Sequence, residues 1–276
     1  MTRAGDAYFE LRRMLAASPS ADLDAALLMT HVLGCGRAAL AAAPERQLDD
    51  AQLAELKDLA ARRHDGEPVA YLIGRRGFWT LDLEVTPDVL VPRPETELLV
   101  EIALEALRAI AEPRVLDLGT GSGAMALAIA SERPDALVTA VEQSAAALAV
   151  AARNAGRHRI GNVRFLHGSW YQPVGAERFH AIVANPPYVA EDDPSLATLV
   201  HEPRAAFVAG PQGLDAIAEI CAGALSHLEA GGLLAVEHGA TQDAPVRTMM
   251  NAAGLRGVAT SNDLAGLPRA TRGNAG

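Results

Sequence analysis

The chain has 276 residues, half of them hydrophobic and 21% charged, which predicts a folded protein of one large domain or two ordinary ones. Its two cysteines, Cys35 and Cys221, stand far apart, which excludes a disulfide scaffold or a cysteine zinc cluster and is typical of a reduced cytoplasmic protein. The net charge is −10, and no segment is apolar for long enough to form a membrane-spanning helix or a secretory signal, so we expect no membrane attachment.

The negative charge is spread along the whole chain. Residues 1–85 carry 10 basic and 13 acidic residues, and the remainder carries 14 basic and 21 acidic residues. Affinity for duplex DNA or RNA comes largely from neutralising phosphates with basic side chains. Because neither part of the chain is basic, we expect no direct contact with nucleic acid. We also expect the protein to act as a monomer.

The N-terminal part of the chain is predicted to be helical. Between residues 8 and 64 apolar side chains recur every three or four positions, and Gly34-Cys35-Gly36 marks the end of one helix. This part contains no chemical motif. We therefore predict a helical domain over residues 1–75 whose role is packing or recognition of a partner.

Residues 76–113 are expected to form a hairpin and a proline-rich linker. Phe78–Val85 alternates apolar and polar side chains, as a half-buried strand does, and the prolines that follow fix turns. Arg93-Pro94-Glu95-Thr96-Glu97 then opens a helix predicted through residue 110, with acidic side chains at its positive end.

From residue 114 onwards short apolar strands alternate with helices. Strands are predicted at 115–118, 137–141, 163–166, 181–184 and 233–237, with weaker signals near 257–260 and 268–272. Helices are predicted at 124–131, 144–154, 214–228 and 245–253. Such alternation is typical of an α/β fold with a doubly wound, mostly parallel sheet, here over residues 114–276.

A glycine-rich turn leaves the first of these strands and enters a helix. Its sequence, Asp117-Leu118-Gly119-Thr120-Gly121-Ser122-Gly123, allows a sharp turn and a close approach of the backbone to a ligand. Glu142 ends the next strand, where a carboxylate can accept hydrogen bonds from two ribose hydroxyls. The glycines alone are compatible with a bare tight turn. Together with Glu142 they favour a nucleoside cofactor.

A second motif, Asn185-Pro186-Pro187-Tyr188, directly follows the fourth strand. Its prolines fix the backbone and remove N–H donors, so the turn offers mainly acceptors. The Asn185 side-chain oxygen and the Pro186 carbonyl can each accept one N–H bond, and Tyr188 can pack flat on a planar group. This set suits a planar target that carries an NH₂ group, although the same four residues elsewhere would indicate only a rigid turn.

These motifs resemble those of class I S-adenosylmethionine-dependent methyltransferases that modify planar amino groups. The release-factor glutamine methyltransferase family is more similar still, including in the helical N-terminal part. The further stretches that it shares are Gly77-Phe78-Trp79, Val91-Pro92-Arg93-Pro94-Glu95-Thr96-Glu97, Glu202-Pro203 and Glu237-His238-Gly239. The similarity covers residues 8–273, and its most specific parts are the PRPETE stretch and the NPPY motif.

The resemblance implies a Rossmann-like class I methyltransferase with a seven-stranded sheet and a small N-terminal helical domain. It implies that S-adenosyl-L-methionine is the cofactor, leaving as S-adenosyl-L-homocysteine, and that peptide-chain release factors are the partners. The implied reaction methylates the side-chain amide nitrogen of the glutamine in their GGQ motif and thereby modulates translation termination.

The same resemblance assigns roles to particular residues. The cofactor would be lined by Gly119, Thr120, Gly121, Ser122, Gly123, Glu142, Trp170 and Asn185. The glutamine would be held by Asn185, Pro186, Pro187 and Tyr188, of which Asn185, Pro186 and Tyr188 would be catalytic. Ser169 stands where family members often have an acidic residue, so the adenine contact would rest on Ser169, Trp170 or a backbone group.

Three other readings of the motifs remain open. A ribosomal-protein glutamine methyltransferase shares the NPPY motif, but it has a proline-arginine-serine-proline type of sequence in place of PRPETE. A DNA adenine methyltransferase would need base flipping and a basic recognition surface, which the charge disfavours. A non-catalytic binding protein could keep the fold, but the glycines, Glu142 and the NPPY motif are all intact.

The predicted chemistry needs no strong base before methyl transfer, because the proton can leave the nitrogen afterwards. We therefore assign none of His180, His201 and His238 as a general base. No cluster of His, Asp and Glu has the spacing of metal ligands, and we expect no metal.

Overall fold

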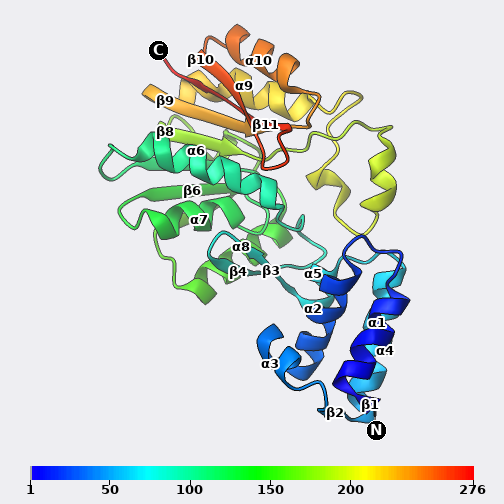
Figure 1. Cartoon of the computed structure of the whole chain (residues 1–276). Helices are drawn as coiled ribbons and strands as arrows, with labels where there is room; N and C mark the ends of the chain where they lie inside the picture. The colour runs from blue at the N-terminus through cyan, green and yellow to red at the C-terminus, as the bar shows by residue number, and fades with distance from the viewer. Residues whose placement is uncertain (1) are drawn as a thin grey trace. The chain divides into compact units, whose positions relative to one another are not determined.

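The computed structural model describes residues 2–276, which divide into two compact units, one ending at Arg75 and one spanning Arg76–Gly276 (Figure 1). The predicted hairpin and the proline-rich segment both belong to the second unit. In the part of the chain that the structure describes, no helix is long and apolar enough to cross a membrane.

The first unit is built of short helices and one small pair of strands. The helices are α1 (Ala4–Met14), α2 (Ala21–Leu33), α3 (Arg37–Ala42), α4 (Asp50–His64) and α5 (Val69–Ile73), and β1 (Thr2–Arg3) pairs antiparallel with β2 (Gln47–Leu48). Gly34 ends α2 in the left-handed conformation (φ 59°), as the sequence predicts. Asp49 and Gln52 form a reciprocal capping box at the start of α4. Leu28, Met29 and Leu56 lie in the core of this unit.

The second unit begins with a hairpin of β3 (Arg75–Phe78) and β4 (Leu81–Glu84). The prediction of one strand over Phe78–Val85 is wrong at its start, because Trp79 takes a left-handed conformation (φ 54°) and turns the chain. The Glu97 carboxylate holds this turn by accepting a hydrogen bond from the Trp79 backbone N–H at 2.7 Å. Such a tertiary contact leaves no trace in the local alternation of side chains.

A seven-stranded sheet forms the centre of the second unit, and this confirms the predicted fold class. Its strands are β5 (Arg114–Leu118), β6 (Leu137–Glu142), β7 (Val163–His167), β8 (Phe179–Ala184), β9 (Leu228–Glu237), β10 (Arg256–Asn262) and β11 (Pro268–Asn274). The order is β10-β11-β9-β8-β5-β6-β7. The five strands from β5 to β9 are parallel, whereas β11 runs antiparallel to both of its neighbours.

Helices cover both faces of this sheet (Figure 1). They are α6 (Glu97–Leu107), α7 (Ala124–Glu132), α8 (Ala145–His158), α9 (Asp215–His227) and α10 (Asp243–Ala252), with single 3₁₀ turns at Pro94–Thr96, Gln172–Val174, Pro194–Thr198 and Arg204–Ala206. Neighbouring residues of β5 point to opposite faces: Val115 packs with α6 and α7, and Leu116 packs with α9 and α10. Because both faces are covered, these strands are apolar throughout.

The chain reverses its direction of sheet growth between β5 and β8. From β5 it adds β6 and β7 on one side, and then returns to place β8 and β9 on the other. Open α/β sheets bind ligands at such a point, beyond the carboxyl ends of the strands. The glycine turn, Glu142 and the NPPY motif follow the ends of β5, β6 and β8 respectively, so the fold brings all three to this edge.

Candidate active site

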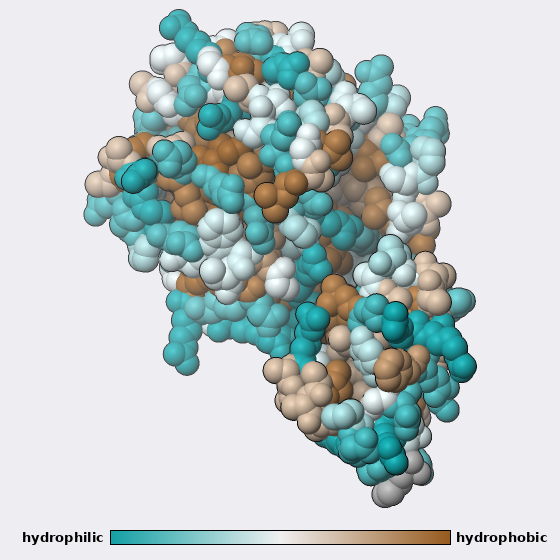
Figure 2. Space-filling view, viewed as in Figure 1, coloured by the Kyte–Doolittle hydropathy of each residue, from teal (hydrophilic) through white to brown (hydrophobic). Residues whose placement is uncertain are grey.

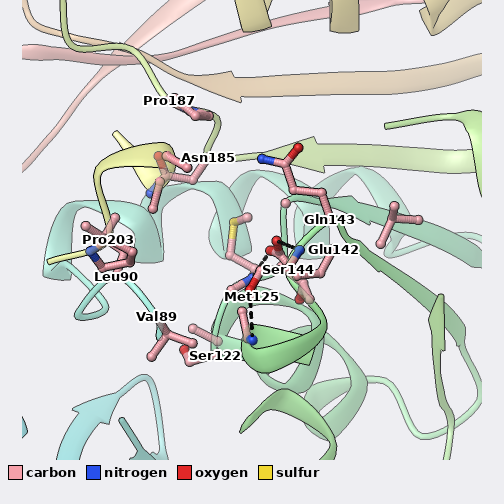
Figure 3. Close-up of a pocket in the computed structure, with 18 of the residues that line it drawn as sticks. Val89, Leu90, Ser122, Met125, Glu142, Gln143, Ser144, Asn185, Pro187 and Pro203 are labelled. Atoms are coloured by element: carbon pink, nitrogen blue, oxygen red, sulfur yellow. Dashed lines mark hydrogen bonds between the residues drawn. The ribbon is translucent and has the colours of Figure 1, made fainter. Parts of the chain in front are cut away.

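A cavity opens beyond the carboxyl ends of β5, β6 and β8, with an empty volume of about 1080 Å³ including its open mouth (Figure 3). Of the residues predicted for the site, those that line the cavity are Gly119, Thr120, Gly121, Ser122, Glu142, Trp170, Asn185 and Pro187. Gly123, Pro186 and Tyr188 are not among its lining residues. The fold therefore gathers residues from four loops, 119–122, 142–144, 168–170 and 185–187, around one space.

The three glycines of the turn have different roles. All have positive φ, at 74° for Gly119, 56° for Gly121 and 86° for Gly123, a conformation that is strained for other residues. A Cβ on Gly123 would lie 3.1 Å from Leu127 Cδ1 and 3.2 Å from Ala151 Cβ. Gly123 thus allows α7 and α8 to pack closely behind the turn, while Gly119 and Gly121 face the cavity.

Asp117, at the end of β5, is fully buried beneath the turn. Its Oδ2 accepts hydrogen bonds from the Thr120 hydroxyl at 2.6 Å and from the Ala126 backbone N–H at 3.1 Å. Burial raises the pKa of Asp117 to about 7, opposed by these two hydrogen bonds. Its other oxygen, Oδ1, has no partner among the described residues. Asp117 opens the glycine-rich motif of the sequence, but its burial and its unpartnered oxygen arise only from the fold.

Glu142 is held in place by two backbone groups (Figure 3). Its Oε2 accepts from the Gly121 N–H and its Oε1 from the Ser144 N–H, each at 2.9 Å. Ser144 caps α8 by accepting from the Ala147 N–H at 3.2 Å. Each carboxylate oxygen has capacity for a further hydrogen bond, and the residue lines the cavity. Glu142 can therefore receive two hydroxyl groups from a ligand.

The loop after β7 contributes an aromatic wall. Trp170 has a left-handed backbone (φ 42°), and its indole Nε1 donates to Glu219 Oε2 at 3.0 Å. The indole ring lies against Gly119, where an added Cβ would stand 3.5 Å from it. Ser169 also lines the cavity. The strain at Trp170 is consistent with a residue fixed by its surroundings at a functional site.

Asn185 presents its side-chain amide at the cavity with a defined orientation (Figure 3). The amide Nδ2 donates to Thr96 Oγ1 at 3.0 Å, and the Thr96 hydroxyl donates in turn to Glu237 Oε2 at 2.7 Å. This leaves the amide oxygen Oδ1 of Asn185 available as an acceptor. Thr96 is the last residue of the PRPET turn that precedes α6.

Tyr188, unlike Asn185, does not line the cavity. Its ring packs against the core on the α9 side of the sheet, and its hydroxyl donates to Glu237 Oε1 at 3.1 Å. Burial raises the pKa of the Tyr188 hydroxyl, so this group is a hydrogen-bond donor at neutral pH. The backbone carbonyl of Tyr188 accepts from Gln242 Nε2 at 3.0 Å, which fixes the end of the NPPY turn.

Part of the cavity wall comes from segments to which the sequence motifs gave no chemical role. The proline-rich segment supplies Val89, Leu90, Pro92, Arg93 and Thr96, and the stretch after Glu202 supplies Pro203, Ala205 and Ala206. Glu202 joins the two segments: it accepts from the Val91 N–H at 3.0 Å and pairs with Arg93. The PRPETE and Glu202-Pro203 stretches were visible in the sequence, but their meeting depends on the fold.

His180 and His238 are occupied by structural contacts. The buried His238 ring contacts Gly239 O and Thr271 Oγ1, each at 2.8 Å, and burial lowers its pKa. His180 Nδ1 accepts from the Arg114 N–H at 3.0 Å, at the start of β5 and so at the edge of the sheet opposite the cavity. Within residues 2–276 no three His, Cys, Asp or Glu side chains gather as a potential metal site.

Two family models and several relatives match this chain. Residues 6–74 match the PrmC N-terminal domain, and residues 95–210 match the methyltransferase small domain. The chain is 51% identical over 253 residues to a release factor glutamine methyltransferase of Xylella fastidiosa, covering 91% of this chain and 92% of the relative. It is 50% identical over 268 residues to a release factor glutamine methyltransferase of Burkholderia pseudomallei, covering 94% of each chain.

A solved structure shares the fold. The 16S rRNA N2 G1207 methyltransferase of T. thermophilus, in complex with AdoMet and guanosine, superposes with a TM-score of 0.56 at 19% identity, covering 73% of this chain and 50% of that chain. The much higher identity to the two relatives spans nearly the full length of both chains. The resemblance predicted from the PRPETE and NPPY stretches is thus confirmed, and the chain belongs to the release factor glutamine methyltransferase family.

Proposed function

We propose that this chain transfers a methyl group from S-adenosyl-L-methionine to the side-chain amide nitrogen of the glutamine in the GGQ motif of peptide-chain release factors. The observation that carries the proposal is the fixed amide of Asn185, whose free oxygen stands at a cavity beside the glycine turn and Glu142. Relatives that are half identical to this chain carry the name of that activity.

The residues at the turn fit such a cofactor. Gly119 and Gly121 line the cavity without Cβ atoms, and Glu142 offers two oxygens for hydroxyl groups. Beneath this turn the buried Oδ1 of Asp117 has no partner among the described residues, and such an oxygen gains from a donor nearby, although Asp117 does not itself line the cavity. When bound, S-adenosyl-L-methionine supplies a methyl group on a positively charged sulfur. We propose that Gly119–Ser122, Glu142, Trp170 and Asn185 hold it, with Gly123 acting through helix packing.

The acceptor side must overcome the low nucleophilicity of an amide nitrogen, whose lone pair is delocalised into its carbonyl. We propose that Asn185 Oδ1 and the Pro186 carbonyl each accept one N–H of the substrate amide. Holding a reactant in a productive orientation can contribute about 7–11 kcal/mol to lowering a barrier. The same acceptors stabilise the positive charge that develops on the nitrogen, and its proton then leaves to water.

Pro187 and Tyr188 complete the proposed acceptor site. Pro187 lines the cavity and limits the space beside Asn185. Tyr188 is anchored through its hydroxyl to Glu237 and would hold the end of the NPPY turn in place. The turn would then offer a rigid surface to the planar amide.

We further propose that residues 1–75 recognise the partner protein. This unit contributes no residue to the cavity lining, yet it exposes large apolar side chains, with Phe9 65% and Leu23 42% accessible. Figure 2 shows hydrophobic residues at the surface of this unit among hydrophilic ones. Exposed aromatic side chains are common anchors in protein interfaces.

One experiment tests the activity and the recognition together. The purified chain is incubated with methyl-labelled S-adenosyl-L-methionine in four separate reactions. Each reaction contains one candidate substrate: an intact release factor, a short GGQ peptide, ribosomes or duplex DNA. We expect label on the release-factor glutamine, located by mass spectrometry, and a lower KM for the intact factor than for the peptide. Label on ribosomes or DNA with none on release factors would contradict the proposed substrate. Equal KM values for factor and peptide would contradict recognition by residues 1–75.

The contact at Glu202 leads to a prediction about the cavity wall. Glu202→Ala is expected to lower the free energy of unfolding by about 1–3 kcal/mol, because the Val91 N–H loses its acceptor inside the protein. The KM for the release factor should rise more than the Kd of the cofactor, since Glu202 holds Arg93 and the proline-rich segment rather than the glycine turn or Glu142. Chemical denaturation and steady-state kinetics measure both effects. Glu202→Gln keeps an acceptor for Val91 and should lose less stability; an alanine variant as stable as the wild type would contradict the prediction.

A further inference from the structure

A buried carboxyl group lies behind the NPPY turn. Glu237 ends β9, the neighbour of β8 in the sheet, and is 1% exposed. Burying a carboxylate is costly unless hydrogen bonds compensate, so its two partners are informative. Its Oε2 accepts from the Thr96 hydroxyl at 2.7 Å and its Oε1 from the Tyr188 hydroxyl at 3.1 Å. Both partners come from other elements, the turn before α6 and the loop after β8.

Thr96 connects this carboxyl group to the proposed acceptor site. Its hydroxyl oxygen accepts from Asn185 Nδ2 at 3.0 Å. A hydroxyl has a single proton, and an ionised carboxylate can only accept. With Glu237 ionised, the Thr96 proton must point towards Glu237, so the Thr96 oxygen can only accept from Asn185. The amide of Asn185 is therefore held with its NH₂ towards Thr96 and its oxygen free for the cavity.

We propose that Glu237 is a positioning residue that, through Thr96, sets which end of the Asn185 amide faces the methyl acceptor. The inference rests on the proposed function and deepens it at the same site. If residue 237 could donate to Thr96, the Thr96 hydroxyl could turn towards Asn185. The Asn185 amide could then rotate and present its NH₂ to the substrate NH₂, donor against donor. The carboxylate of Glu237 removes this alternative without touching the substrate.

The positioning role requires the ionised form of Glu237, and the groups around its carboxyl act in both directions. Burial raises its pKa to about 7, whereas the hydroxyls of Thr96 and Tyr188 and the charge of Arg269 act in the opposite direction, and Glu95 adds to the increase. Arg269 comes from β11 and is itself engaged with Asp263. The donors directed at the carboxyl oxygens are thus the two hydroxyls, and both favour the charged, accepting form.

The first test compares Glu237→Gln with a matched substitution on the same strand. Glutamine keeps the size of Glu237 but adds a donor, so kcat on the release factor is expected to fall about 10–100-fold, as is typical when a supporting partner of a functional residue is removed. The Kd of S-adenosyl-L-methionine by calorimetry and the melting temperature should stay close to wild type. Glu229→Gln, at the other end of β9 and paired with Arg114, should leave kcat unchanged.

The second test uses Thr96 and separates positioning from packing. Thr96→Val removes the hydroxyl at nearly constant volume and should lower kcat about as much as Glu237→Gln, whereas Thr96→Ser keeps the hydroxyl and should retain kcat within about threefold. The kcat of the double variant Glu237→Gln/Thr96→Val should be little lower than that of the less active single variant, because both substitutions break the same chain of hydrogen bonds.

The outcomes separate this inference from the proposed function. A wild type that does not methylate release factors overturns the proposed function. An active wild type with Glu237→Gln and Thr96→Val both within about threefold of its kcat overturns the positioning role. Equal losses in Thr96→Ser and Thr96→Val, or a loss of cofactor affinity in step with kcat, would assign these residues to the fold and also overturn it.

Discussion

Replacing Asn185 with alanine is expected to lower the turnover number for methyl transfer by about 10²–10³-fold, a loss typical of deleting one group that stabilises developing charge. The Asn185 amide is tied through Nδ2 to Thr96, which leaves its oxygen for the substrate. Alanine removes this acceptor, and the Pro186 carbonyl alone cannot fix both N–H groups of the substrate amide. Single-turnover rates on a purified release factor, at saturating cofactor, measure the loss.

Two controls make this result specific to Asn185. The Kd of S-adenosyl-L-methionine, measured by calorimetry, should change less than the turnover number, since Glu142 and the glycine turn remain intact. Asn251→Ala, an exposed position on α10 outside the cavity lining, should behave as the wild type. Near-normal turnover of Asn185→Ala on a release factor would show that the acceptor site lies elsewhere.

Replacing Glu142 with alanine is expected to raise the Kd of S-adenosyl-L-methionine by about 10–100-fold. Hydrogen bonds to a charged group contribute about 1.5–3 kcal/mol, and each 1.4 kcal/mol changes a binding constant tenfold. Two such bonds from ligand hydroxyls are proposed at Glu142. Its present bonds to the Gly121 and Ser144 N–H groups, which hold the cofactor turn, would also be lost. Isothermal calorimetry with the cofactor measures the change.

The kinetic signature of Glu142→Ala should differ from that of Asn185→Ala. At saturating cofactor the turnover number should recover most of the way to wild type, because the acceptor side is unaffected. Glu177→Ala is a suitable control, since Glu177 pairs with Arg164 and does not line the cavity. An unchanged cofactor Kd in Glu142→Ala would remove Glu142 from the proposed binding site.

Much of the second unit could be predicted from local pattern. The alternation of short apolar strands with helices predicts the parallel sheet, because strands buried on both faces are continuous apolar runs. The Ser144 cap, and in the first unit the turn at Gly34, follow from chemistry within a few residues. The hairpin was predicted less well: Trp79 turns the chain because of Glu97, a partner 18 positions away that local alternation cannot reveal.

Some features of the candidate site could also be recognised from local pattern, whereas others depend on the fold. Glu142, Asn185 and the glycines were recognisable because each follows a strand end, and parallel strands bring their carboxyl ends to one edge. The motif contained Asp117, but its unpartnered oxygen depends on the fold. That Gly123, Pro186 and Tyr188 lie outside the cavity lining likewise depends on the tertiary structure.

The sequence by itself determined the fold class, the family and the loops that would meet, since these depend on periodicity and on motifs a few residues long. Only the tertiary structure decided how Asn185 is oriented, because the side chains that orient it are distant in sequence. Thr96 is 89 positions from Asn185, and Glu237 is 49 positions from Tyr188, the NPPY residue that it contacts. It likewise decided that Glu202 joins two walls of the cavity across 111 positions. Hydrogen bonds act over about 3 Å in space regardless of separation along the chain, so such partners become visible only once the chain has folded.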